Sequence, residues 1–390
     1  MLLIKNATLY TMEEPGIIQG GDILIKEGKI AAVGRDLQAS DAQIIDASRL
    51  YITPGLIDAH SHAGGFETHS QQSDVNENTN PITPHINVIH SIDVSDPCFM
   101  LSPKVGVTTV CIPPGSSNVI GGMAITLKTH GTNIHKMVIQ NPAAMKCALG
   151  GSPKGYGRRN QMPMTRMAIA HLLREALRKA QVYQQKLAEA EEDAEKKPVY
   201  DAQNEALLPV LRREIPLKVH CEQFDMLTII EIAREFEVNY TIEHGWAGDL
   251  FVEELYAGGG PVNFGPIGIV EGVGELTGGD IAVAKILDDR GIHVSLMTDS
   301  PVFSSEALLI SAGEAVRIGI DHQRALEMIT LRPAEALGLG DRLGSLKPGK
   351  DADLVIFAGI PALDTNARVL CTIIDGQIVY QAPEAETPCC

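Results

Sequence analysis

The sequence predicts an α/β protein in which a (β/α)8 barrel, the TIM barrel, is joined to a small β domain built from both chain ends. Two patterns predict this fold. Short alternating strands with tight turns occupy both ends of the chain, whereas eight apolar runs alternate with helical patterns in the middle. That alternation is typical of parallel strands joined by helices, and eight such units close a barrel. The 390 residues also exceed what one compact domain usually holds.

The two ends of the chain share one pattern. In each, a glycine turn separates two apolar alternations: Glu27-Gly28-Lys29 near the start and Asp375-Gly376 near the end. Such turns join antiparallel strands into hairpins. The economical inference is one small β domain that contains both ends. The strands predicted for it are residues 2–9, 21–26, 29–33, 43–46, 352–357, 369–375 and 377–380.

The middle of the chain supplies the barrel. A long helix is expected over residues 165–197, where apolar residues recur at helical spacing, and residues 63–97 form a long polar loop after the first barrel strand. The barrel strands are predicted to be parallel. They are residues 55–60, 107–112, 124–127, 145–149, 217–220, 240–243, 261–263 and 293–297.

Composition excludes several classes of partner. A net charge of −17 disfavours nucleic acid and anionic membranes, because phosphate binding needs a basic surface. No apolar run reaches membrane-spanning length, and the first residues indicate a strand rather than a signal peptide. The seven cysteines lack CxxC spacing, which favours a reducing, cytoplasmic location. Residues 383–390 are predicted to be a disordered tail.

Histidines and an aspartate follow the predicted barrel strands. One apolar run ends in His60-Ser-His62, and alternate residues of a strand face the same side, so both imidazoles point one way. His220, His244 and Asp299 end three further strands. Because barrel strands converge at their C-terminal ends, these five residues are expected to meet. Any one of them alone would more often be a structural residue, but together they indicate a site for zinc or another first-row divalent metal.

These residues carry a resemblance to the metal-dependent amidohydrolase superfamily, over nearly the whole chain and in order. Within it, the chain is most similar to the branch of imidazolonepropionase and the Xaa-Pro and Xaa-Arg dipeptidases. The resemblance implies a β-sandwich of residues 1–53 plus 340–382 and a metal-bearing hydrolase barrel of residues 54–339. The motifs are Pro54-Gly-Leu-Ile-Asp-Ala-His-Ser-His62, Gly106-Val-Thr-Thr-Val110, His220, Glu243-His244-Gly245, Thr298-Asp299-Ser300 and Lys347-Pro-Gly-Lys-Asp-Ala-Asp-Leu-Val355.

The resemblance also implies the metal ligands and their number. His60, His62 and Asp299 would hold one ion and His220 and His244 a second. Lys146, followed by Gly150-Gly151, is similar to the lysine that is carboxylated and bridges two metals in binuclear members. A carbamate balances two cations because it replaces a positive charge with a negative one. Alternatively, Lys146 stays an ammonium that binds a substrate carboxylate or forms a salt bridge. Lys128 is a weaker rival, and Lys218 shares a strand face with His220.

The expected reaction is attack of a metal-bound hydroxide on an amide carbonyl. Asp299 would accept the proton of the water and pass it to the leaving nitrogen, as general acid and base. In a version with one metal, His244 would instead hydrogen-bond the substrate carbonyl or the water.

A basic loop follows the predicted fourth barrel strand. It carries Lys154, Tyr156, Arg158 and Arg159 among glycines. Arginine binds carboxylates bidentately, so this loop is a candidate clamp for a substrate carboxylate, with the Tyr156 hydroxyl in the site. The alternative is a solvated basic loop.

The predicted function is hydrolysis of a C–N bond in a dipeptide, an N-acyl amino acid or a cyclic amide. The alternatives are a mononuclear deaminase, an imidazolonepropionase-like enzyme, or a non-catalytic assembly protein on the same fold. The substrate is expected to be a small molecule and the chain to form homo-oligomers. Zinc is the favoured metal, in one or two ions per chain, with two favoured.

Overall fold

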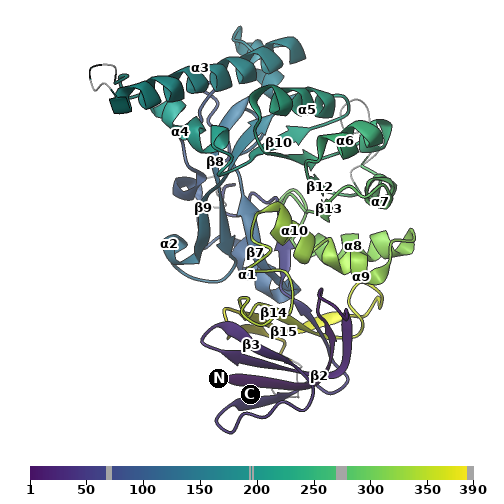
Figure 1. Ribbon diagram of the computed structural model, residues 1–390. Helices are drawn as coiled ribbons and strands as arrows, with labels where there is room; N and C mark the ends of the chain where they lie inside the picture. The colour runs from purple at the N-terminus through teal and green to yellow at the C-terminus, as the bar shows by residue number, and fades with distance from the viewer. Residues whose placement is uncertain (67–72, 193–194, 196, 269–278, 384–390) are drawn as a thin grey trace.

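The computed structural model describes residues 1–66, 73–192, 195, 197–268 and 279–383, so the tail predicted to be disordered lies outside the described residues except for residue 383. Figure 1 shows the terminal strands gathered below the barrel, with the long helix α3 at the opposite end. The barrel and the terminal sheet have separate hydrophobic cores. The architecture is therefore an α/β barrel attached to a sheet.

Strands from both chain ends form one hydrogen-bonded sheet in the order β16-β15-β14-β5-β1-β2-β3, with β4 also paired to β1. Glu27 and Gly28 both have positive φ, as do Asp375 and Gly376, which suits the predicted hairpin turns. The joining of the two ends is confirmed; the two-layer sandwich stays a prediction. The strands are β1 Leu2–Tyr10, β2 Ile17–Lys26, β3 Lys29–Gly34, β4 Gln43–Asp46, β5 Tyr51–Pro54, β14 Leu354–Ala358, β15 Arg368–Ile374 and β16 Gln377–Gln381.

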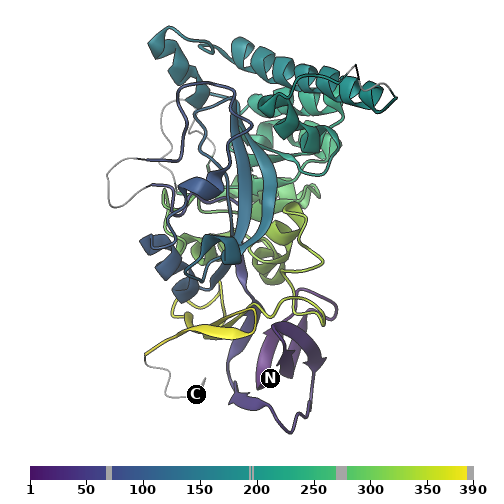
Figure 2. The ribbon, with the colours of Figure 1, turned by 90° about the vertical axis from the view of Figure 1, so that its left-hand side faces the viewer.

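The barrel sheet contains eight strands, each overlapping a predicted one, in the order β13-β12-β11-β10-β9-β8-β7-β6. The expectation that all run parallel is wrong at β8, which pairs antiparallel with both β7 and β9. The connections around β8 are too short for a crossover helix, so the chain reverses instead. Figure 2 shows β8 and β9 as the two long blue strands. The strands are β6 Leu56–Asp58, β7 Val107–Ile112, β8 Ile120–Lys128, β9 Val138–Ala148, β10 Leu217–Cys221, β11 Tyr240–His244, β12 Val262–Phe264 and β13 Val294–Leu296.

Helices surround the barrel, and α3 is the long helix that the sequence predicts. It begins and ends within the predicted range. No helix in the described ranges is both long enough and apolar enough to cross a membrane. The helices are α1 Pro97–Leu101, α2 Ile134–Met137, α3 Arg166–Glu192, α4 Ala202–Leu211, α5 Asp225–Phe236, α6 Val252–Gly258, α7 Ile281–Asp289, α8 Ala307–Arg317, α9 His322–Glu327 and α10 Leu331–Ala336, with short 3-10 turns η1 Val88–Ser91, η2 Ser102–Val105, η3 Ser152–Arg159 and η5 Gly248–Phe251.

Backbone hydrogen bonds just past the C-terminal ends of β6 and β13 join the first and last strands of the barrel. The amide of Asp299 donates to the carbonyl of His60 (3.1 Å), and the amide of His62 donates to the carbonyl of Ser300 (2.6 Å). Just before this seam, the buried carboxylate of Asp58 accepts hydrogen bonds from the Thr298 hydroxyl and amide. The seam therefore brings the HxH segment next to Asp299.

A buried lysine links the barrel to the terminal sheet. Because β8 is antiparallel, Lys128 lies at the opposite end of the barrel from His60, where its ammonium contacts Asp351 (3.0 Å), Asp353 and Asp375 (3.3 Å). Burial would lower the pKa of Lys128, but the carboxylates of Asp353, Asp375 and Asp351 outweigh it and raise the pKa. Lys128 is thus excluded as a metal-bridging residue, and the sequence-based suggestion was wrong.

Replacing this lysine is expected to destabilise the fold. Lys128→Met removes the cation that the buried Asp353 carboxylate contacts, which should lower the free energy of unfolding by about 3–5 kcal/mol. Urea denaturation measures the change. Lys26→Met is the control, since Lys26 faces Glu27 across 3.9 Å on the surface and its loss should cost about 0.5 kcal/mol or less. Equal losses in both variants would contradict the role of Lys128.

Candidate metal centre

Three side chains from the barrel seam come together as a group of possible metal ligands. Their ligand atoms, on His60, His62 and Asp299, all lie within 4.8 Å of one another. Oδ1 of Asp299 is 3.4 Å from Nε2 of His60 and 3.2 Å from Nε2 of His62. His60 is completely buried and His62 is nearly so. The sequence-predicted trio is therefore assembled in the structure.

The other ring nitrogen of each histidine is held by an acceptor. Nδ1 of His60 lies 2.8 Å from the Glu243 carboxylate, and Nδ1 of His62 lies 3.0 Å from the Pro113 carbonyl. Nδ1 of His244 similarly lies 2.9 Å from the Gly265 carbonyl. Acceptors at Nδ1 place the proton there and leave Nε2 as the lone-pair ligand, which is the usual arrangement around a metal-binding histidine.

The buried polar atoms of the site fit a divalent metal. Nε2 of His60, Oδ1 of Asp299 and Nζ of Lys146 are buried without a hydrogen bond in the described part of the chain. Unsatisfied buried polar atoms are costly, so a cluster of them points to a bound group. Imidazole nitrogens and a carboxylate oxygen suit zinc and related first-row ions.

The electrostatics keep His60, His244 and Asp299 deprotonated. Burial, with the charges of Lys146 and Lys218, lowers the pKa of His60 well below its usual value. Burial and the neighbouring His220 lower the pKa of His244 to about 3. For Asp299, burial works toward a higher pKa, but the close approach of His62 and His244 outweighs it and lowers the pKa to about 2. Neutral imidazoles and a carboxylate are the forms that bind metals.

His220 and His244 lie beside the trio rather than in it. Their rings are 4.3 Å apart, and the ring of His244 is 5.4 Å from that of His60. Both ring nitrogens of His220 have protein partners: Nε2 lies 2.8 Å from a Glu222 oxygen, and Nδ1 lies 3.1 Å from the Ser116 hydroxyl. The five predicted residues are thus neighbours, but His220 faces a carboxylate in this arrangement.

Both Asp299 and His244 have left-handed backbone conformations, with φ of 57° and 73°. Residues other than glycine rarely adopt positive φ, and such strain often marks functional sites. Each residue ends or follows a strand, β11 for His244 and β13 for Asp299. The turn of the backbone at these points accompanies the change from strand to loop at the mouth of the barrel.

Two buried lysines lie side by side beneath the histidines. Lys146 on β9 pairs in register with Lys218 on β10, and both are almost completely inaccessible. The ammonium of Lys218 lies 2.8 Å from the Glu243 carboxylate. Burial lowers the pKa of Lys146 to about 8, although the charges of Glu243 and Asp299 oppose the shift. The two lysines therefore differ, since only Lys218 has a carboxylate at contact distance among the described residues.

Glu222 and Glu243 were not proposed as functional residues from the sequence. Glu222 has a recognisable signal, because it follows His220 at a spacing of two and therefore shares its face in an extended segment. Glu243 belongs to the Glu-His-Gly motif, but the sequence analysis assigned a metal-binding role only to its neighbour His244. Nothing in the spacing indicates that its side chain reaches His60, which follows β6, the strand at the far end of the sheet order from β13.

The basic loop after β9 forms the 3-10 turn η3. Two of the residues predicted to bind substrate instead donate hydrogen bonds to backbone carbonyls of the polar loop that follows the first barrel strand. The buried Tyr156 hydroxyl donates to the carbonyls of Asn80 (2.9 Å) and Glu77 (3.3 Å). Arg159 donates to the carbonyl of Asn78 (2.6 Å) and lies over the Tyr156 ring. Tyr156 and Arg159 therefore hold this loop in place. A substrate contact stays a prediction for Lys154 and for Arg158, which is exposed.

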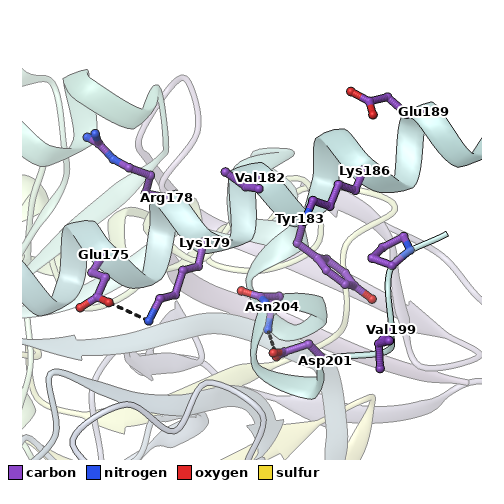
Figure 3. A pocket seen from close by; sticks show the side chains of 11 residues that line it. Glu175, Arg178, Lys179, Val182, Tyr183, Lys186, Glu189, Val199, Asp201 and Asn204 are labelled. Atoms are coloured by element: carbon purple, nitrogen blue, oxygen red, sulfur yellow. Dashed lines mark hydrogen bonds and ion pairs between the residues drawn. The ribbon is translucent and has the colours of Figure 1, made fainter. Parts of the chain in front are cut away.

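Aromatic rings border the histidine cluster. The ring of Trp246 is 4.8 Å from that of His244, and the ring of Phe66 is 6.3 Å from that of His62. A separate hollow of 730 Å³ lies between α3 and the segment that leads into α4, where Figure 3 shows Tyr183, Lys186 and Val199. It contains none of the predicted site residues, so we do not assign the reaction to it.

Comparisons with known proteins agree with this geometry. The model of the amidohydrolase family matches residues 167–379. The crystal structure of an amidohydrolase from Thermotoga maritima MSB8 is 35% identical, with a TM-score of 0.94, and the match covers 98% of this chain and 100% of that one.

Two curated relatives are more distant. Amidohydrolase tasK of Hapsidospora irregularis is 29% identical over 98% of this chain, which spans 43% of that protein's length. Imidazolonepropionase of Geobacillus kaustophilus is 26% identical, covering 89% of this chain and 85% of that protein.

The loop-holding role of Tyr156 can be tested directly. Tyr156→Phe removes only the hydroxyl, so it should lower the free energy of unfolding by about 1 kcal/mol, the typical net value of one hydrogen bond. Limited proteolysis between residues 73 and 91 should become faster. Arg158→Met, a change at an exposed position, is the control and should alter neither property. A higher KM for an amide substrate with unchanged stability would instead assign Tyr156 to substrate binding.

Proposed function

Because the chain belongs to the amidohydrolase family, we propose that it is a metal-dependent hydrolase of a C–N bond in a small molecule. The substrate classes that we propose are dipeptides, N-acyl amino acids and cyclic amides. The observation that carries this proposal is the buried group of His60, His62 and Asp299, in which two ligand atoms have no hydrogen bond to the residues that the structure describes. The low pKa of His60 and of Asp299 supports it, because both side chains are in their ligand forms at neutral pH.

In the proposed reaction, His60, His62 and Asp299 hold a divalent ion, with zinc favoured. When bound, such an ion acidifies water and polarises the scissile carbonyl. Asp299 accepts the proton of the attacking water and delivers it to the leaving nitrogen. Its low pKa keeps Asp299 ionised near neutral pH, which is the form that can accept a proton. Trp246 and Phe66, beside the histidines, help to exclude water from the site.

We further propose a second ion, held by His220 and His244 and bridged to the first by carboxylated Lys146. Carboxylation needs a neutral amine, and burial lowers the pKa of Lys146 to about 8, so a usable fraction is neutral near pH 7. The Lys146 amine has no hydrogen bond among the described residues, so no such bond needs to break before it reacts. For this arrangement, His220 must turn from Glu222 toward the metals.

A mononuclear enzyme, either a deaminase or an imidazolonepropionase-like hydrolase, is the second candidate function. One observation favours it: both ring nitrogens of His220 already contact Ser116 and Glu222, which leaves a single ligand group in the described residues. In this version, His244 hydrogen-bonds the substrate carbonyl or the water through Nε2. The similarity to imidazolonepropionase over most of the chain is compatible with it. A non-catalytic assembly role is the least supported, since the ligand residues are all present.

Several expectations about context remain part of the proposal. The net charge of −17 favours a small-molecule substrate over nucleic acid or anionic membranes. A cytoplasmic location and a homo-oligomeric state follow from cysteine usage and from the general frequency of symmetric assemblies.

Activity on a substrate panel tests the proposed function. Purified protein, with its metal content measured on the same sample, is assayed against dipeptides, N-acyl amino acids, cyclic imides and aminated ring compounds. We expect release of a carboxylate and an amine from at least one amide class. Ammonia release from a ring compound alone would favour the deaminase. No turnover despite full metal occupancy would contradict both enzymatic candidates.

Lys146→Ala tests the bridging carbamate. Without the bridge, the metal content should fall from two ions per chain, and activity should fall with it. Formate, acetate or propionate should partly restore both, because a small carboxylate fills the space of the missing carbamate; chloride at equal ionic strength is the control. Elemental analysis and steady-state rates provide the measurements. One ion per chain in both proteins would contradict the bridge.

A further inference from the structure

Glu243 is a completely buried carboxylate at the centre of the barrel that the reaction above does not use. It lies on β11, in register with His220 on β10 and Asn263 on β12. Burying an ionised carboxylate is costly unless it is paired and hydrogen-bonded. Its environment therefore indicates what the residue does.

The two oxygens of Glu243 have different partners. Oε1 accepts hydrogen bonds from the Thr241 hydroxyl (2.6 Å) and from the side-chain amide of Asn263 (2.9 Å). Oε2 lies 2.8 Å from Nδ1 of His60 and 2.8 Å from Nζ of Lys218. The Asn263 amide is itself held by the Ser295 hydroxyl on β13. One oxygen is thus fixed by neutral groups, while the other faces the metal centre and its lysine.

The contact with His60 decides which of its nitrogens carries the proton. The ring is completely buried, and an imidazole that binds a metal is neutral, with one N–H and one lone pair. A carboxylate only accepts hydrogen bonds, so Nδ1 must be the donor. The lone pair is then on Nε2, the atom that faces Asp299 at 3.4 Å.

The contact with Lys218 sets the charge beside the site. Lys218 and Lys146 are register neighbours, and two buried ammonium groups there would oppose a divalent cation. Glu243 neutralises Lys218 at contact distance. Lys146 keeps no such partner among the described residues, so the carboxylate also separates the roles of the two lysines.

We propose that Glu243 is a positioning residue for the metal centre: it fixes His60 in the Nδ1–H form and balances the Lys218 charge. Neither effect involves contact with substrate. This inference rests on the proposed metal-dependent function, although its structural part, the protonation of His60, exists in the metal-free chain.

Glu243→Gln tests it. A glutamine has one acceptor oxygen for the four donors around Glu243, and its own amide hydrogens oppose them. Affinity for Zn²⁺, measured by competition with a chelator, should fall roughly 10- to 100-fold, the usual effect of removing an outer-shell partner. In metal-free protein with ¹⁵N-labelled histidine, the His60 ring signals, identified by their loss in His60→Asn, should move from the Nδ1–H pattern of the wild type.

Two further variants separate positioning from stability. Glu243→Asp keeps the charge and should recover part of the affinity. Asp288→Asn is the matched control: it also weakens a buried carboxylate, one that contacts Arg324 and Arg332 far from His60 in the fold, and should leave zinc affinity and the His60 signals unchanged. An equal loss of affinity in Glu243→Gln and Asp288→Asn would overturn the proposal.

The wild-type protein alone also tests the proposal, should Glu243→Gln fail to fold. An Nε2–H pattern for His60 in the metal-free wild type would overturn it, as would an unchanged pattern in Glu243→Gln. If the wild type binds no metal at all, the proposed function fails, yet the Nδ1–H form and its loss in Glu243→Gln would still support the positioning of His60 by Glu243.

Discussion

The seam between β6 and β13 is the constraint on which the site depends. The His62 amide and the Asp299 amide donate across it, and the buried Asp58 carboxylate ties it to Thr298 in a segment 240 residues away in sequence. Closing the barrel therefore also assembles the ligand trio: His60 and His62 come from one side of the seam and Asp299 from the other. Loss of closure would separate the three candidate ligands, so we expect the proposed metal binding to depend on folding of the barrel.

Much of the fold, and the grouping of His60, His62 and Asp299, could be predicted from the sequence by two general properties of strands. Alternation places His60 and His62 on one face, and strand ends of a barrel converge, which brings Asp299 to them. The hairpins of the terminal sheet were equally visible, since paired residues such as Asp375-Gly376 suit positive φ. The alternation of apolar and polar residues does not tell in which direction a strand runs. The sequence therefore did not predict that β8 is antiparallel to its neighbours.

The direction of each strand explains why the three lysines that the sequence offered have different roles, among which the sequence had favoured Lys146. Lys128 ends a strand that runs opposite to its neighbours, so its ammonium meets the aspartates of the terminal sheet. Lys146 and Lys218 lie on strands that run toward the histidines, and one contact, with Glu243, separates them. Contacts of this kind, including that of Glu222 with His220, depend on side-chain conformations across several strands, which spacing along one strand does not specify.

The charges of the buried site connect the state of Lys146 to the number of metal ions. Glu243 and Lys218 form a neutral pair, and the other charged groups close to the histidines include Lys146 and the carboxylates of Asp299 and Glu222. With an ammonium at Lys146, the site already carries a positive charge, and a second divalent ion would meet repulsion in a medium of low dielectric constant. A carbamate reverses that charge and supplies an oxygen ligand to each ion. One ion with an ammonium and two ions with a carbamate would therefore give the site the same net charge, because the second ion adds two positive charges and carboxylation of Lys146 removes two. In the proposed enzyme, the chemical form of this single buried nitrogen would then set the number of ions.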